Sequence, residues 1–172
     1  MNWISSNSAE DELIDVFERC HSNLLGTVFY VVGNLEDARD VLQDAFVKCW
    51  LHREELPGIS NIQSWAFTVA LNSARDRRKS AWSRRRQSLP EGDDMLSPPE
   101  YSPEAALLRE EEVGRVRTAI LTLDPGEQEV FLLRQNGGLT YDEIAESVGA
   151  PVGTVKTRMR SALRRLREAV AN

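Results

Sequence analysis

The sequence contains few of the residues that catalytic, metal and redox sites require. It has only two cysteines, Cys20 and Cys49, and two histidines, His21 and His52. It has no glycine-rich phosphate loop and no cluster of Asp, Glu and His at metal-ligand spacing. Both cysteines fall on apolar helical stripes, which favours buried free thiols over a disulfide. We therefore expect no catalytic residue, no metal and no cofactor.

Long apolar runs and strand patterns are missing as well. No run of about 18 uncharged apolar residues could span a membrane, and the start of the chain has neither the basic nor the apolar region of a secretory signal. No segment alternates apolar and polar residues as a strand does. These absences predict a cytoplasmic, all-α protein. A chain of 172 residues can form one medium core or two small ones.

Charge is abundant, but it is unevenly distributed along the chain. The net charge is -6, yet residues 75–86 hold seven bases and one acid, and residues 156–167 hold six bases and no acid. The acids gather mainly in residues 1–55 and 87–114. This pattern indicates two contacts with nucleic acid, set between surfaces that avoid nucleic acid or meet a basic protein.

Apolar residues recur at steps of three and four in the first half of the chain, which is typical of amphipathic helices. The spacing predicts one helix through 13–31 that ends near Gly33, and a second that follows an N-cap at Asn34. A third helix is expected from about Asn61 into the first basic block. Three such helices can share one small core, which predicts a domain over 8–86. Two apolar residues off the main stripe of the third helix could complete this core or contact a partner: Phe67 and Leu71.

Prolines separate this domain from a second one. Four of the seven prolines lie in 88–103, together with several acids. Proline excludes helix and like charges repel, so we expect an extended acidic linker over 87–103. Helices resume in a second small domain over 104–172. There, Asp124 with Glu127 and Thr140 with Glu143 have the spacing of capping boxes.

The spacing between residues 141 and 160 is that of a helix-turn-helix. Gly149 supplies the left-handed turn residue, and Ile144, Val148 and Val155 form the core that sets the angle between the helices. The second helix would then enter the major groove of DNA. Its outward residues can bind phosphates and base edges: Thr154, Lys156, Thr157, Arg158, Arg160 and Arg164. A solvated face of a small bundle is the alternative, but such a face normally mixes charge signs.

Two regions of the chain resemble a known family. The stretch LDPGEQEVFLLRQNGGLTYDEIAESVGAPVGTVKTRMRSALRRLRE resembles the C-terminal, promoter-reading domain of the extracytoplasmic-function (ECF) sigma factors of bacterial RNA polymerase. The stretches VVGNLEDARDVLQDAFVKCW and SWAFTVALNSARDRRKS resemble the first domain of the same family. A helix-turn-helix alone is common to many regulators, so the specific signal is the pairing of both domains in family order. The resemblance implies a subunit that recognises −35 and −10 promoter elements and assists promoter melting.

The resemblance also implies a polymerase contact. In this family the second helix of the first domain docks on a coiled coil of the largest polymerase subunit. The face opposite the apolar stripe would carry Glu36, Arg39, Asp40, Gln43, Asp44 and Val47. A largely acidic face that avoids DNA suits a protein partner, although solvation alone would also account for these acids.

The loop before the third helix and the basic block at its end are the candidates for contact with unpaired DNA. Arginines near an aromatic residue, here Trp82, suit single strands, because bases stack and phosphates are bound by charge; Trp82 could equally cap the helix end. The resemblance implies that the loop captures an unstacked base of the −10 element. Trp65 is expected mainly in the core. The candidate residues are Ile59, Ser60, Asn61, Ile62 and Gln63 in the loop, and Asn72, Arg75, Arg77 and Arg78 on the helix.

Core RNA polymerase and promoter DNA are the partners that the resemblance implies, with an anti-sigma factor between the two domains in most members. No small-molecule substrate and no membrane insertion are expected. Opening about a dozen base pairs costs on the order of 15 kcal/mol, which is more than two small modules could supply, so polymerase must share the work. In the family the linker threads the RNA channel; a solubilising tether is the open alternative.

Two other functions compete with this interpretation. A stand-alone helix-turn-helix regulator would bind an operator as a dimer, but residues 1–86 contain neither a visible ligand or receiver domain nor a dimer seam. A decoy that binds polymerase without reading promoters would not need the basic block at 75–86.

Overall fold

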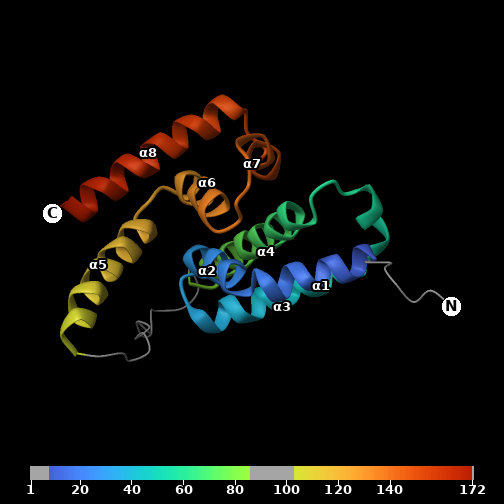
Figure 1. The fold of residues 1–172 in the computed structure, drawn as a ribbon, viewed down its shortest axis with the longest axis horizontal. Helices are drawn as coiled ribbons and strands as arrows, with labels where there is room; N and C mark the ends of the chain where they lie inside the picture. Colours follow the sequence, from blue (N-terminus) through green and yellow to red (C-terminus); the bar gives the residue numbers. More distant parts are fainter. Residues whose placement is uncertain (1–7, 86–102, 172) are drawn as a thin grey trace.

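The structure is a computed structural model that describes residues 8–85 and 103–171 (Figure 1). Over these residues the fold is all-α. The expected linker lies outside these residues except for Pro103, which begins a helix. The first domain comprises α1 (Ala9–Arg19), α2 (His21–Val32), α3 (Leu35–Leu51), the 3-10 helix η1 (Arg53–Gly58) and α4 (Ile62–Arg85). The second comprises α5 (Pro103–Leu121), α6 (Pro125–Gln135), α7 (Tyr141–Val148) and α8 (Val152–Ala171). The predicted all-α class is confirmed.

The core of the first domain lies between α2, α3 and α4, with α1 packed across them. Leu13 and Leu24 have no exposed surface, as their helical spacing predicts. Leu71, which lies off the main stripe of α4, is fully buried as well and so completes this core. Small side chains also line the buried faces of α3 and α4, where Ala45 and Ala70 are fully buried. Burial of these faces removes apolar surface from water, which is the main force that holds the helices together.

The first helix is divided, whereas the apolar spacing predicted one continuous helix. Cys20, with φ −97° and ψ 9°, ends α1 and precedes α2. Its N–H still donates to the carbonyl of Val16, and its own carbonyl accepts from the N–H of Leu24. Cys20 is buried with the same apolar stripe. The apolar stripe therefore continues through the break, so the spacing of apolar residues does not predict where α1 ends and α2 begins.

Most of the expected helix ends are confirmed. Gly33 ends α2 with φ 94°, and the side chain of Asn34 accepts a 2.8 Å hydrogen bond from the N–H of Asp37. Thr140 and Glu143 form the predicted capping box, and α7 ends at the left-handed Gly149, with φ 64°. A left-handed φ strains residues that have a Cβ, which is why glycine suits both turns.

The capping box predicted at Asp124 is wrong. The Asp124 side chain makes no cap hydrogen bond, although Pro125 does occupy the first turn of α6 as expected. The carboxylates of Asp124 and Glu127 instead lie 3.0 Å and 3.4 Å from the guanidinium nitrogens of Arg165 on α8. Charge-assisted bonds to a guanidinium are stronger than a bond to a neutral N–H, so the long-range partner replaces the local one.

The two domains contact each other directly. Helices α6 and α7 face α2 and α4 in Figure 1, and contacts join α2 to α6 and α4 to α7. Gly137, in the turn between α6 and α7, packs so closely that an added Cβ would lie 3.2 Å from Cδ1 of Phe67 on α4. Phe67 is fully buried. The off-stripe position of Phe67 thus serves the contact between the domains. Among the described residues, no helix is long and apolar enough to cross a membrane.

Candidate nucleic-acid and polymerase interfaces

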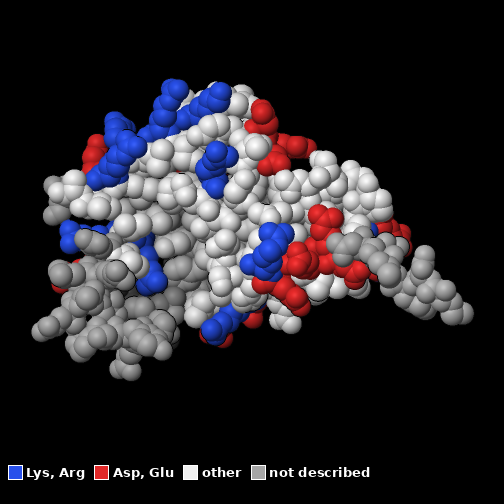
Figure 2. Space-filling model, viewed as in Figure 1, with Lys and Arg blue, Asp and Glu red and all other residues white. Residues whose placement is uncertain are grey.

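Helix α8 separates an apolar face from a basic one. Val155, Met159 and Ala162 are buried against the other helices of the domain. The basic face turns outward, and Figure 2 shows Lys and Arg side chains gathered along α8. The sequence candidates on this face that are exposed are Lys156, Thr157, Arg160 and Arg164. Their exposure fits a surface that can reach DNA.

Two other candidates on α8 are less accessible. Thr154 and Arg158 are half-buried. The guanidinium of Arg158 lies over Gly126 at the start of α6, where an added Cβ would be 3.0 Å from its Cζ. Arg165 was not among the candidates, and its pairing with Asp124 and Glu127 holds α8 against α6. Arg165 therefore helps to orient the basic face of α8, although it is not one of the candidate DNA-binding residues.

The candidate polymerase face on α3 is open to solvent. All six of its residues are exposed: Glu36, Arg39, Asp40, Gln43, Asp44 and Val47. Asp40 lies 3.6 Å from Arg77 on α4, which also lies 3.6 Å from Asp37. Arg77, a candidate for the DNA strand, is thus linked electrostatically to the acidic face.

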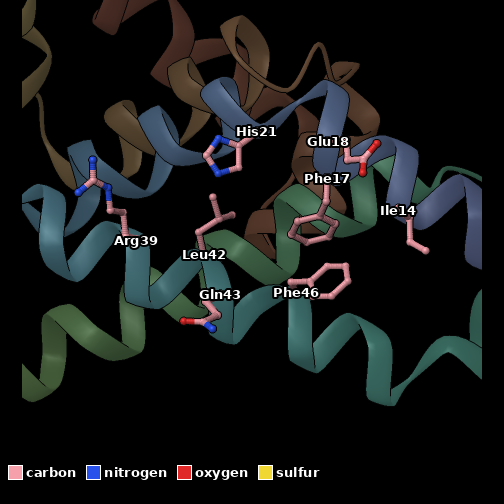
Figure 3. Close-up of a pocket in the computed structure, with 8 residues that line it drawn as sticks. All are labelled: Ile14, Phe17, Glu18, His21, Arg39, Leu42, Gln43 and Phe46. Atoms are coloured by element: carbon pink, nitrogen blue, oxygen red, sulfur yellow. The ribbon is translucent and has the colours of Figure 1, made fainter. Parts of the chain in front are cut away.

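A pocket adjoins this face. It has a volume of about 560 Å³ and lies between α1, the start of α2, and α3 (Figure 3). Phe17 and Phe46 both line it and meet edge to face, with ring centroids 5.1 Å apart. Its other lining residues are Ile14, Glu18, His21, Arg39, Leu42 and Gln43. The candidate polymerase face is therefore continuous with a largely apolar pocket, since Arg39 and Gln43 belong to both.

The loop predicted to capture a base does line a cavity. Ile59, Ser60 and Asn61 contribute to a cavity of about 290 Å³, together with half-buried Trp65 on α4. Ile62 has only 4% of its surface exposed and belongs to the core. Three residues of α7 form the opposite wall: Glu143, Glu146 and Ser147. The cavity thus combines the expected loop with a wall that the sequence did not indicate.

The loop residues bond to the second domain. The Asn61 side chain donates a 2.7 Å hydrogen bond to Glu143, and the Gln63 side chain donates one of 2.7 Å to the carbonyl of Gly137. Bonds from Asn61 and from the N–H of Thr140 hold the pKa of Glu143 below its ordinary value, the Thr140 bond contributing most. Glu143 is therefore kept as a carboxylate.

The arginines of α4 also meet a carboxylate of the second domain. Arg75 donates to both oxygens of Glu129, at 2.9 Å and 2.5 Å, and Arg78 lies 3.7 Å from the same side chain. The hydrogen bond with Glu129 raises the pKa of Arg75, in spite of its burial. Asn72 accepts a bond from Arg75 at 3.1 Å. The structure therefore brings together Asn72, Arg75 and Arg78, but around an acid from α6.

Sequence reasoning missed Glu129, although a signal was present. Glu129 precedes the buried Leu132 and Leu133 by three and four residues, so it falls on the apolar face of α6. A carboxylate on a buried face requires a partner, because an unpaired buried charge is costly. The side chain of Trp82 lies outside the described part of the structure. No group of three or more possible metal ligands occurs among the described residues.

Comparison with known proteins matches each domain to a family model. The sigma-70 region 2 model matches residues 16–84, and the sigma-70 region 4 model matches residues 114–166. The RNA polymerase sigma-H factor of Pseudomonas aeruginosa is 32% identical over 144 residues, 79% of this chain and 74% of that protein. The ECF RNA polymerase sigma factor RpoE of Cereibacter sphaeroides is 28% identical over 171 residues, 98% of this chain and 91% of that protein.

A solved structure has a similar fold. The sigma factor RpoE of Bartonella quintana, crystallised with the anti-sigma factor NepR, superimposes with a TM-score of 0.76 at 21% identity. The match covers 94% of this chain and 96% of that chain. Two family models in the order of the sigma factors, together with relatives that extend over most of the chain, lead to one conclusion: the chain belongs to the extracytoplasmic-function family of RNA polymerase sigma factors.

Proposed function

We propose that this protein is a promoter-specificity subunit that binds core RNA polymerase and directs it to −35 and −10 elements. The observation that carries the proposal is the pairing of sigma-70 regions 2 and 4 in one chain, each with a basic block of its own. Region 2 would extend over 8–86 and region 4 over 104–172, with 87–103 between them. As a sigma factor, the protein acts in initiation without catalysis of its own.

Helix α8 is the proposed reader of the −35 element. Its exposed bases can bind phosphates and fix the register of the helix in the major groove, while Thr154 and Thr157 can bond base edges near its N-terminus. The ion pairs between Arg165 and the start of α6 support this role, because they hold the reading helix at a set angle. Arg158 would have to leave Gly126 to reach a phosphate.

The loop 59–63 and helix α4 are the proposed reader of the −10 element as a single strand. Asn61 and Trp65 line the cavity beside this loop. The side-chain amides of Asn61 and Gln63 would bond a base edge only after they leave Glu143 and Gly137. Arg75, with Arg77 and Arg78, would then follow the strand backbone. Since melting costs more than these contacts supply, the open promoter must also be stabilised by polymerase.

The exposed face of α3 is the proposed dock for polymerase, and the protein would work in the cytoplasm with that enzyme. The similar RpoE of Bartonella quintana forms a complex with an anti-sigma factor, which supports a regulator of that class for this chain too. A stand-alone operator-binding regulator is not favoured, because the family of the chain assigns it to polymerase.

Reconstitution with core RNA polymerase tests the proposal. Purified protein and core enzyme are mixed with genomic DNA, and the start sites of the transcripts are sequenced. We expect co-purification of protein and polymerase, and starts that share a spaced pair of upstream elements. A chain that does not bind polymerase, or starts with no shared elements, would overturn the proposed function.

A further inference from the structure

The side of α8 that faces away from the domain can be located from its buried side. An α-helix turns about 100° per residue, and the four buried residues of α8 lie on one side between Val155 and Leu166. Four residues lie within about 50° of the opposite direction. We call them the outward row, and all of them are exposed: Gly153, Thr157, Arg160 and Arg164. This row is the part of α8 that would face base edges in a major groove.

Other bases of α8 lie on its two flanks. Lys156 is exposed and points about 90° from the outward direction, whereas Arg158 points about 110° to the other side. The flank of Arg158 faces α6, because Arg158 lies over Gly126 and the neighbouring Arg165 pairs with Asp124. Side chains on the flanks are placed to meet the phosphates that border a groove. Sequence must therefore be read mainly by the outward row.

Only two side chains of the outward row can reach bases. Gly153 has no side chain, and a Cβ at this position would have no atom within 4 Å, so the helix is open to DNA there. Arg164 lies about 18 Å along the helix from Val152, beyond the width of a major groove, which is about 12 Å. Thr157 and Arg160 remain. They are separated by a rise of about 4.5 Å, and base pairs by about 3.4 Å, so the two side chains meet base pairs one or two steps apart.

The hydroxyl of Thr157 is already committed to the backbone. It donates a 3.0 Å hydrogen bond to the carbonyl of Gly153, so it has no proton left to donate to a base. Its methyl group and an oxygen lone pair remain available to DNA. In the major groove an A·T pair presents a thymine methyl and the adenine amino donor. An A·T pair therefore matches both groups that Thr157 offers, whereas a C·G pair matches only the acceptor.

Arg160 offers a planar fork of donors. A guanidinium can bond the O6 and N7 acceptors of guanine with two parallel hydrogen bonds. Adenine presents an amino donor in place of O6, so it accepts only one of these bonds. Arg160 therefore favours guanine over adenine at the base pair that it meets.

We propose that Thr157 reads an A·T pair of the −35 element and that Arg160 reads a guanine one or two steps away, while Lys156 and Arg164 bind phosphates. The proposal rests on the proposed function of α8 and names the bases that this helix selects. Sequence preference then comes from two side chains, and the flanking bases of the helix supply affinity for any duplex.

Selection of duplexes by the full chain tests the role of Arg160. The protein is incubated with a random duplex library at low salt, and the bound duplexes are sequenced. We expect a motif in which a guanine lies one or two steps from an A·T pair. Arg160→Gln should change that guanine to adenine, because glutamine bonds adenine N6 and N7, and Arg160→Ala should lower the preference at this position at least about fivefold. No enriched motif, or the same motif with both variants, would overturn the proposal.

Lys156→Ala is the matched control on the same helix. As a phosphate contact, Lys156 should contribute equally to all duplexes, so its loss should keep the motif, weaken binding uniformly and reduce the salt slope by about one. A motif that changes with Lys156→Ala would assign base reading to the flank and contradict the outward row.

Removal of a single methyl group from the DNA tests Thr157. Deoxyuridine in place of the thymine of the selected A·T pair deletes only the methyl group. We expect wild-type affinity to fall about two- to fourfold, and Thr157→Ser, which keeps the hydroxyl, to bind both duplexes equally. No loss with the wild type, or the same loss with Thr157→Ser, would refute the role of Thr157.

Transcription with core polymerase separates this proposal from the proposed function. If the wild type directs polymerase to shared elements but the Arg160 variants keep the same preference, base reading is wrong and the proposed function stands. If the wild type does not bind polymerase, the proposed function fails, and duplex selection by the full chain still decides which bases α8 reads. Arg160→Gln should also restore transcription from a promoter in which the selected guanine is replaced by adenine, and failure to do so would count against Arg160.

Discussion

At the scale of single residues, Cys49 is the clearest case of chemistry set by burial. It has no exposed surface in α3, and desolvation raises the pKa of its thiol from 9.0 to about 12. Because the thiolate is the reactive form, we predict that Cys49 resists alkylation in the folded protein and reacts only as fast as the first domain opens. Labelling with and without denaturant, followed by peptide mass analysis, measures this. Rapid labelling of the native protein would contradict it.

The exposed bases of α8 give a second prediction at this scale. Lys156→Ala and Arg160→Ala should each weaken binding to the promoter by about 1–3 kcal/mol if these side chains bond bases. Promoter-dependent transcription should fall, whereas polymerase binding should not change. Arg117→Ala, which removes an exposed arginine from α5, is the control. Promoter-dependent transcription and polymerase pull-down are measured on the same preparations. Parallel loss of both activities would mean that these residues act outside DNA recognition.

At the scale of elements, the acidic face of α3 should serve polymerase alone. We predict that charge reversal at Asp40 and Asp44 lowers affinity for core polymerase, because an acidic patch that meets a basic partner becomes repulsive. Duplex binding by the free protein should not decrease. Titration of labelled polymerase measures the first effect and fluorescence anisotropy the second. Unchanged polymerase affinity would place the dock elsewhere.

The stability of the fold should depend on pH through Glu143, in the first turn of α7. The pKa of Glu143 is lowered by its bond from the Thr140 N–H and also by its bond from Asn61. A carboxylate whose folded pKa is depressed stabilises the fold above its unfolded pKa, here about 4.5, and this stabilisation is lost as pH falls through the folded value. We predict that Glu143→Gln lowers the melting temperature at neutral pH and that the difference from wild type shrinks below about pH 4.5. A constant difference across this range would contradict it.

At the scale of the whole molecule, the distribution of charge should control non-specific binding. The net charge of -6, and the pairing of Arg75 on α4 with Glu129, leave mainly the face of α8 to attract duplex DNA. We predict that the isolated chain binds random duplex at the weak end of the usual range for non-specific binding, with a Kd of about 10⁻⁴ M at physiological salt. Fluorescence anisotropy over a salt series measures this. Submicromolar binding would show that the acids do not suppress DNA binding.

Local sequence determined most of the helices and their ends. The caps at Asn34 and Thr140, the turn at Gly149 and the basic face of α8 follow from residues within one or two turns of each other. Such features depend on backbone hydrogen bonds and on helical spacing, which neighbouring residues decide. The pairing of the two basic blocks with two helical domains was visible in the same way.

Only the tertiary structure decided which charges meet. Asp124 bonds Arg165 and not its own helix, and Arg75 meets Glu129 from 54 positions away. The break between α1 and α2 at Cys20 was likewise visible only in the tertiary structure, because the apolar stripe continues through it. A guanidinium takes whichever carboxylate the packing of helices brings within reach, and the packing of α6 and α7 on α4 is set by burial at Phe67. Sequence thus determined the DNA-binding candidates, and the fold decided that some of them are covered.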